Sequence, residues 1–468
     1  MGVRLPRLEA LLGVRSIPED LDAGVLARLV EAAITEDPDL DFKKAPWPSG
    51  PAGAIALATD VAAFANTAGG LLLVGVEEEQ TVATGLARLP YVENVERGWR
   101  EVLAGRLAPP AAVVVRHVPV GEGGGVWAIA VPRSRDAPHA VRLYGLPRPE
   151  ERKTEHSLLY PARDGTGTRW MTEPEVSRRY RDRFTAQRAD EERLLALLDR
   201  TASGLGQWAG QADNGQWPSW HAAYALVASV PTLPGDEPLD RFSANRAQAW
   251  LREWRQSAPP IHSEISDGSV VVRRNRVVAS GVLPGGRTRV DAAEHAALYT
   301  DGAGLMALFV SFPILDWDRY PGATADDVLV GPLNVEQQVL AAVSLLAGHA
   351  LRVRAGGDAL LAAQIVLPPA EGPTARGMVA FETEPYTRLL GGADRITGTA
   401  PALTAVPVAD LASGPGQVAA AAVLAAELLS DFGVAGTTGV HDDGTVTALP
   451  SLRGLAAWAG QQGVTTRQ

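Results

Sequence analysis

Acidic residues and a lysine surround a short apolar segment near residue 40. Glu36 and Asp41 lie five residues apart across a turn, and Lys43 follows on the same strand face as Asp41. Carboxylate oxygens can hold a divalent cation that neutralises phosphate charge and activates a water, and a lysine can stabilise the pentacovalent phosphate. These residue types suit metal-dependent cleavage of a phosphodiester. The alternative is a solvated acidic junction between a helix and a strand, which the spacing alone favours.

A second acidic group follows a continuous apolar run over residues 71–76, which is typical of a strand covered on both faces. One carboxylate among Glu77, Glu78 and Glu79 could supply a third metal ligand. If this strand pairs parallel to residues 40–43, however, the two acidic groups need not meet. A run of carboxylates after a strand is also typical of a solvated loop.

Two further groups of residues could contact phosphates. Asn66 and Thr67 precede Gly69-Gly70 and could present an amide and backbone N–H groups, although a helix C-cap explains the same residues. Arginines recur from residue 163 to residue 188 and include a stripe of near-helical spacing, which suits a phosphate backbone. Pairing with Glu175 and Asp182 on an exposed helix explains this stripe equally well.

The elements that must position these residues alternate between helices and strands. Apolar periodicity and the glycine and proline breaks predict helices over 54–68, 93–107 and 173–198. They predict strands over 40–43 and 71–76, and a strand pair of 111–115 with 118–120 and of 126–131. A compact α+β unit over residues 1–190 follows from this pattern. We expect residues 191–240 to be a linker region, and residues 241–468 to form an α/β sensor or oligomerisation domain with helices near 335–350 and 408–430.

Composition narrows the class of protein. The 468 residues exceed one ordinary domain. The absence of cysteine excludes disulfides and thiolate zinc sites, and the eight histidines show no metal-ligand spacing, so we expect no structural zinc. No apolar run reaches the length of a membrane span, and the first residues lack a signal peptide, so we expect a cytoplasmic protein without membrane contact.

Charge is uneven along the chain. Residues 1–190 hold 24 Lys and Arg against 26 Asp and Glu, so most of the formal net charge of −11 lies in the remainder. This balance disfavours a protein that coats DNA. Any nucleic acid should bind the N-terminal half.

Several strings in the first half, taken together, resemble the core domain of the Schlafen family, the Schlafen/AlbA-type domain. They are Glu36-x4-Asp41-Phe42-Lys43, the run Ala62–Glu78, Asp136–His139 and Tyr160–Met171. The resemblance covers about residues 20–190. It implies an α+β fold that binds nucleic acid.

In nuclease members the resemblance also implies a three-carboxylate site that uses Mg²⁺ or Mn²⁺ to cleave structured RNA such as tRNA, in antiviral defence or stress response. The matched catalytic positions are Glu36, Asp41, Lys43 and Glu77, and the metal ligands are Glu36, Asp41 and Glu77, with Glu78 as substitute. The residues expected to bind nucleic acid are Lys44, Asn66, Thr67, Arg163, Arg169, Arg178 and Arg181.

Two functions that act on nucleic acid therefore stand side by side, and a scaffold subunit whose N-terminal domain has lost both of them is a third alternative. One is a metal-dependent endoribonuclease acting on tRNA-like RNA, with DNA as a further possible partner. The other is a non-catalytic nucleic-acid-binding regulator, favoured by Asp41 and Glu77, which stand where Glu and Asp are usual, and by the acidic net charge. By base rate we expect a homo-oligomer.

Overall fold

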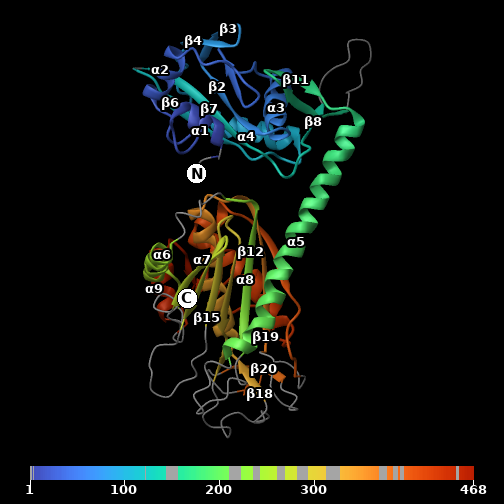
Figure 1. Cartoon of the computed structure of the whole chain (residues 1–468), viewed down its shortest axis with the longest axis vertical. Coiled ribbons are helices and arrows are strands. Elements are labelled where there is room, and N and C mark those ends of the chain that lie inside the picture. Colours follow the sequence, from blue (N-terminus) through green and yellow to red (C-terminus); the bar gives the residue numbers. More distant parts are fainter. Residues whose placement is uncertain are drawn as a thin grey trace. The chain divides into compact units, whose positions relative to one another are not determined.

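The computed structural model divides into two compact units, Met1–Gln187 and Arg188–Gln468 (Figure 1). The structure describes residues 3, 5–121, 123–143, 157–209, 223–235, 243–260, 269–281, 294–312, 327–367, 377–382, 388–389, 395–449 and 453–467. No helix in these ranges is both long and apolar enough to cross a membrane.

The first unit is built on a four-stranded sheet in the order β1-β2-β7-β6. Its strands are β1 (Leu40–Lys43), β2 (Gly69–Val74), β7 (Gly125–Pro132) and β6 (Val114–Pro119). β1 runs parallel to β2, and the other neighbours are antiparallel. All six residues of β2 are buried, as the continuous apolar run predicts.

Helices cover both faces of this sheet. Leu71 and Leu73 point into one core, and Leu72 and Val74 into the other. The first core includes α1 (Pro6–Leu12) and α2 (Ala23–Glu31), and the second includes α3 (Pro51–Ala65) and α4 (Val95–Arg106). The predicted α+β architecture is confirmed, although α3 begins and ends three residues earlier than the pattern indicated.

Two glycines shape the turn between α3 and β2. Gly69 has a φ of +80°, which favours glycine. A Cβ on Gly70 would lie 2.2 Å from the ring of Phe64, so the absent side chain lets α3 approach the sheet. The strand predicted over 71–76 ends at Val74, because Gly75 (φ +108°) redirects the chain into a separate hairpin.

Small strand pairs complete the first unit. They are the hairpin β3 (Val76–Glu79) with β4 (Val82–Leu86), the sheet of β5 (Leu107–Ala108), β8 (Ala140–Leu143) and β9 (Ser157–Leu159), and the hairpin β10 (Pro161–Asp164) with β11 (Gly167–Trp170). The last hairpin turns at Gly165 and Thr166, between the paired residues Asp164 and Gly167.

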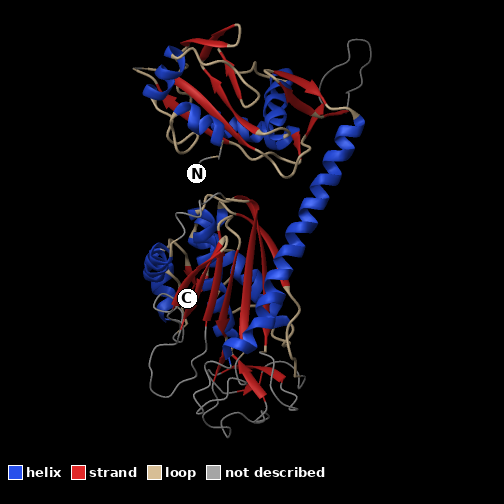
Figure 2. Ribbon diagram, viewed as in Figure 1, coloured by secondary structure: helices blue, strands red, loops and turns tan. Residues whose placement is uncertain are grey.

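The second unit contains a seven-stranded antiparallel sheet (Figure 2). In sheet order its strands are β13 (Ser269–Arg273), β14 (Arg276–Gly281), β15 (Glu294–Tyr299), β16 (Gly304–Phe309), β12 (Tyr224–Leu233), β19 (Gly356–Val366) and β22 (Ala402–Pro407). One face packs on α6 (Ala244–Ser257), α7 (Pro332–Arg352) and α8 (Gly414–Ser430). The other face packs on leucines from the second half of α5 (Glu173–Ala209).

A smaller sheet and several short elements complete the second unit. They are β17 (Ser311–Phe312), β18 (Asp327–Val330), β20 (Gly377–Glu382) and β21 (Arg388–Leu389), then the 3-10 helix η4 (Asp410–Ala412), and β23 (Val446–Thr447), α9 (Arg453–Gln461) and β24 (Thr466–Arg467).

The linker that we predicted over residues 191–240 is not what the described parts of that range form. Leu194, Leu197 and Leu198 on α5 are buried against the large sheet, and β12 lies within that sheet. Glycine, proline and tryptophan content suggested a linker, but burial on both faces holds β12 in the core. Residues 210–222 and 236–240 lie outside the described residues. The helix predicted over 408–430 begins only at Gly414, after η4.

A buried histidine makes the second unit sensitive to acid. His349 on α7 is fully buried with Nε2 2.7 Å from the Tyr299 carbonyl oxygen, and burial lowers its pKa to about 4. The unfolded chain therefore binds more protons below about pH 6.5, so stability falls as pH drops toward 4. We expect a loss of about 2 kcal/mol between pH 7 and pH 5 from this group.

Urea titrations at pH 7 and pH 5 measure this loss. A His349→Gln variant should lose about 2 kcal/mol less than wild type over the same interval, because glutamine does not titrate. Equal losses in both proteins would assign the acid sensitivity to other groups.

Candidate functional site

Four charged side chains form a connected group beside β1, which we call the Asp41 cluster: Asp41, Lys43, Asp60 and Arg163. Asp41 Oδ2 accepts from Lys43 Nζ at 2.6 Å, and Asp41 Oδ1 accepts from Arg163 Nη1 at 3.1 Å. Lys43 Nζ also lies 4.0 Å from Asp60 Oδ2. Asp41 and Lys43 lie on one strand face, as predicted, and both oxygens of Asp41 have a cationic partner.

Arg163 enters this cluster from β10 and is almost completely buried. Its side chain is 3% exposed, and its guanidinium lies 4.8 Å from the centre of the Phe64 ring. Nε and Nη2 have no hydrogen-bond partner within the described residues. We predicted that Arg163 binds nucleic acid, but its guanidinium is buried against Asp41 and Phe64 and does not offer a surface contact.

Asp60 is the member that sequence reasoning missed. It accepts from Trp47 Nε1 at 2.9 Å. Burial raises the pKa of Asp60, while the Lys43 ammonium and the Trp47 indole oppose that shift. The signal was a lone charged residue in the otherwise uncharged helix α3.

The other predicted acids have separate partners. Glu36 Oε1 accepts from the Phe42 N–H at 2.7 Å, and Glu77 pairs with Lys44 at 2.8 Å. Glu78 accepts from the Thr81 N–H at 2.8 Å. β3 turns away from the β2 direction at Gly75.

These positions do not match the predicted three-carboxylate metal site. Within the part of the chain that the structure describes, no three carboxylate or histidine side chains are gathered to hold a metal ion. The oxygens of Asp41 already bind two cations, and Glu77 faces Lys44. As arranged, the residues do not fit Mg²⁺ or Mn²⁺.

Asn66 and Thr67 tie segments of the domain together. The fully buried Asn66 amide donates to the carbonyl oxygens of His139 and Pro161 and accepts from the His139 N–H. Thr67 Oγ1 donates to the Ala63 carbonyl and accepts from the Arg163 N–H. The expected phosphate contact by Asn66 does not fit this burial, because every polar atom of its side chain is used internally.

The segment that contains these residues matches a known family. Residues 36–169 match the family described as Schlafen, AlbA_2. They form a Schlafen/AlbA_2 domain. This confirms the predicted resemblance, and the matched segment runs from Glu36 to the β10–β11 hairpin within the first unit.

One solved structure shows a further, partial likeness. The chain is similar to the DIP2311 protein from Corynebacterium diphtheriae, at 22% sequence identity and a TM-score of 0.22. That similarity covers 34% of this chain and 28% of the other. No curated protein matches the chain.

Arginines gather where the Schlafen/AlbA_2 domain meets the start of α5; we call Arg133, Arg178 and Arg179 the arginine patch. Burial lowers the pKa of Arg179, and the positive charges of Arg133 and Arg178 lower it further. Asp182 and Glu175 offset part of this repulsion. Of the described residues, none forms an ion pair with Arg133 or Arg178, so positive charge accumulates there.

The remaining predicted arginines differ from one another. Arg169 is paired with Glu175 through contacts of 2.7 and 2.9 Å, as the ion-pair alternative predicted. Arg181 is exposed one turn beyond Arg178. Arg181 therefore extends the arginine patch along α5, and Arg169 does not contribute a free charge.

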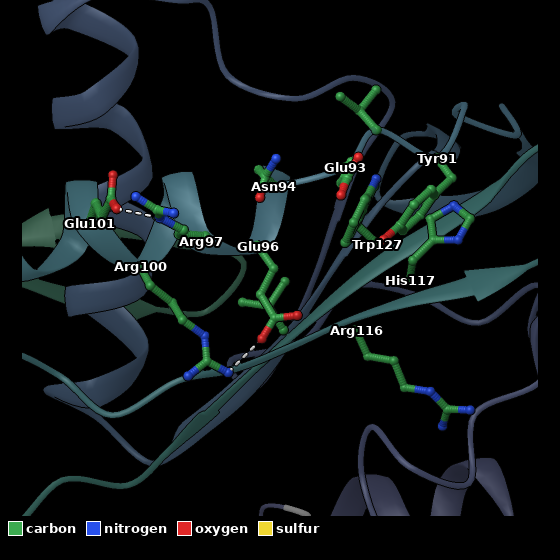
Figure 3. A pocket seen from close by; sticks show the side chains of 12 residues that line it. Tyr91, Glu93, Asn94, Glu96, Arg97, Arg100, Glu101, Arg116, His117 and Trp127 are labelled. Carbon is green, nitrogen blue, oxygen red and sulfur yellow. Dashed lines mark hydrogen bonds and ion pairs between the residues drawn. The ribbon is translucent and has the colours of Figure 1, made fainter.

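A cavity of about 660 Å³ opens elsewhere on the Schlafen/AlbA_2 domain, between α4 and the strands β6 and β7 (Figure 3). Tyr91 stacks on Trp127 at a centroid distance of 5.9 Å, and His117 lies against both rings. Ion pairs of Arg97 with Glu101 and of Arg100 with Glu96 border it. None of the residues predicted from sequence lines this cavity, so it is separate from the Asp41 cluster.

Proposed function

We propose that the protein binds nucleic acid through the arginine patch and that the Asp41 cluster maintains the domain that carries it. Schlafen/AlbA_2 domains are associated with nucleic-acid binding and processing. The observation that carries the proposal is the repulsion of the Arg179 guanidinium by the positive charges of Arg133 and Arg178. A phosphate backbone relieves this repulsion and accepts charge-assisted hydrogen bonds from the guanidinium groups.

The Asp41 cluster supports binding without metal chemistry. Lys43 and Arg163 already neutralise Asp41, and each oxygen of this carboxylate has a cationic partner. A neutralised, buried pair maintains the fold but does not activate a water. The domain then acts as a binding module, which corresponds to the non-catalytic nucleic-acid-binding regulator of the sequence analysis.

Fluorescence anisotropy with a labelled RNA hairpin across a salt series tests the proposal. The double variant Arg133→Gln/Arg178→Gln should bind at least tenfold more weakly, and the slope of log K against log salt should fall by about 2 because two phosphate contacts are lost. Arg97→Gln, which removes an exposed arginine of α4, is the matched control. Equal binding by the double variant and the control would contradict the proposal.

A metal-dependent endoribonuclease acting on tRNA-like RNA is the second candidate. One observation favours it: the carboxyl groups of Glu36, Asp41 and Glu78 lie close enough that Asp41 and Glu78 add to the rise that burial causes in the pKa of Glu36. Cleavage of a tRNA pool, with Mn²⁺, with Mg²⁺ and with EDTA, tests it beside Glu36→Gln. Cleavage that needs metal and disappears in Glu36→Gln would replace the binding proposal; its absence would support binding alone.

A further inference from the structure

Three aromatic rings form a row beside the arginine patch, which we call the aromatic row: Tyr160, Tyr180 and Phe184. The Tyr160 and Tyr180 rings meet edge to face with centroids 6.3 Å apart, and Phe184 stacks on Tyr180 at 6.4 Å and 23°. Tyr180 and Phe184 are one turn apart on α5, so the helix itself aligns them. The row ends in an exposed ring, because Phe184 is 61% exposed.

Tyr160 and Tyr180 contact each other at the inner end of the aromatic row. Their hydroxyl oxygens lie 3.3 Å apart, and burial together with the Tyr180 hydroxyl raises the pKa of Tyr160 to about 12. The Tyr160 hydroxyl therefore stays neutral at physiological pH. The Met171 N–H donates to the Tyr160 carbonyl at 2.8 Å, which joins the row to the segment that follows β11.

Other apolar groups lie exposed on the neighbouring strands. Trp170, at the end of β11, is 50% exposed, and Leu158, on β9, is 53% exposed. Scattered apolar residues on a surface need no explanation, but large ones on adjoining elements around one helix end indicate a contact surface. Arg179 and Arg181 flank Tyr180 on α5, so guanidinium groups lie on the helix faces to either side of the rings.

Aromatic rings interleaved with arginines match the chemistry of single-stranded nucleic acid. Unpaired bases expose flat faces that stack on aromatic rings, while arginines contact the phosphates between them. A duplex hides the same faces within its own stack. An exposed aromatic ring can therefore stack on the bases of a single strand, but it gains few contacts with the bases of a double helix.

We propose that the aromatic row stacks unpaired bases, with Phe184 as the first ring, and that the protein prefers single-stranded nucleic acid or a single-stranded segment over a duplex. This inference rests on the proposed function, because the arginine patch must hold the backbone. A second copy of this chain is the competing occupant of an exposed apolar ring. The flanking arginines argue against it, since two copies would bring like charges together.

Anisotropy titrations of the full chain with a 20-nucleotide oligo-uridine and with a 20-base-pair RNA duplex test the inference. Phe184→Ala should weaken binding of the single strand about tenfold and leave duplex binding within twofold. Phe184→Tyr keeps an aromatic face and should retain wild-type binding. Tyr91→Ala, which removes another exposed aromatic of the domain, is the matched control and should change neither affinity.

The outcomes separate this inference from the proposed function. If Arg133→Gln/Arg178→Gln weakens binding and Phe184→Ala does not, the arginine patch binds nucleic acid and base stacking is refuted. If wild type binds neither RNA, both proposals fail. If Phe184→Ala loses equal affinity for the single strand and the duplex, the inference is also overturned. A change in the sedimentation coefficient of Phe184→Ala without a change in affinity overturns it too, because the ring would then belong to a contact between copies of the chain.

Discussion

Replacing Asp41 with alanine should destabilise the Schlafen/AlbA_2 domain by about 3–5 kcal/mol, the cost of leaving a buried partner charge uncompensated. Arg163 is 3% exposed, and Asp41 accepts the hydrogen bond that its guanidinium donates, so the variant leaves a buried guanidinium without this partner beside the Phe64 ring. Lys43 can reach solvent more easily, because its side chain is 34% exposed. The loss therefore comes mainly from Arg163.

Hydrogen exchange of the β2 segment measures this loss, because β2 is buried at the centre of the first sheet. A loss of 3–5 kcal/mol corresponds to exchange at least a hundredfold faster. Asp164→Ala is the matched control: this neighbour of Arg163 is 73% exposed and lies 3.9 Å from Arg169, so its removal should cost below 1 kcal/mol. Similar exchange in the two variants would contradict the prediction.

Whether Asp41→Ala raises or lowers the stability of the domain distinguishes the nuclease hypothesis from the binding hypothesis. In an empty three-carboxylate metal site, like charges repel, so removing one carboxylate should raise stability. In the Asp41 cluster the carboxylate lies between two cations, so its removal should lower stability. A more stable Asp41→Ala protein would favour the nuclease hypothesis before any substrate is tested.

Replacing Glu336 with alanine should destabilise the second unit by a similar amount, about 3–5 kcal/mol. The carboxylate is 1% exposed and accepts from the N–H groups of Thr438, Gly439 and Val440 at 2.6–3.0 Å. Alanine leaves three backbone donors without an acceptor in a buried position. Each such donor costs about 1–3 kcal/mol.

Hydrogen exchange of α7 segments reports this change, with Glu253→Ala on α6 as an exposed glutamate control. Glu336→Gln keeps one acceptor oxygen and should fall between alanine and wild type. If Glu336→Ala exchanges no faster than the control, the loop at 438–440 does not depend on this carboxylate.

Local contacts of the site were predictable from sequence. The Asp41–Lys43 contact follows from the two-residue period of a strand, and the buried β2 follows from its unbroken apolar run. The pairing of Arg169 with Glu175 follows from their proximity at the start of a helix. Each of these contacts depends on residues a few positions apart.

The rest of the cluster depends on distant contacts. Arg163 reaches Asp41 only because the β10–β11 hairpin folds back over α3, and no local period encodes that return. Asp60 has no charged neighbour on its helix to form a recognisable pattern. Glu77 does not lie at the predicted metal-ligand position beside Asp41, because Gly75 changes the direction of the chain after β2.

The large sequence separation between Asp41 and Arg163 also sets the order in which contacts of this domain can form during synthesis. The two residues are 122 positions apart, so a ribosome that adds roughly 5–20 residues per second needs about 10 s to deliver the arginine after the aspartate. During that interval the β1 carboxylate has no buried cation to receive it, and Asn66 still lacks the Pro161 carbonyl, which is 95 residues away. The domain therefore completes its centre only when its last hairpin emerges. A chain that ends before residue 161 therefore lacks both the Asp41–Arg163 and the Asn66–Pro161 contacts.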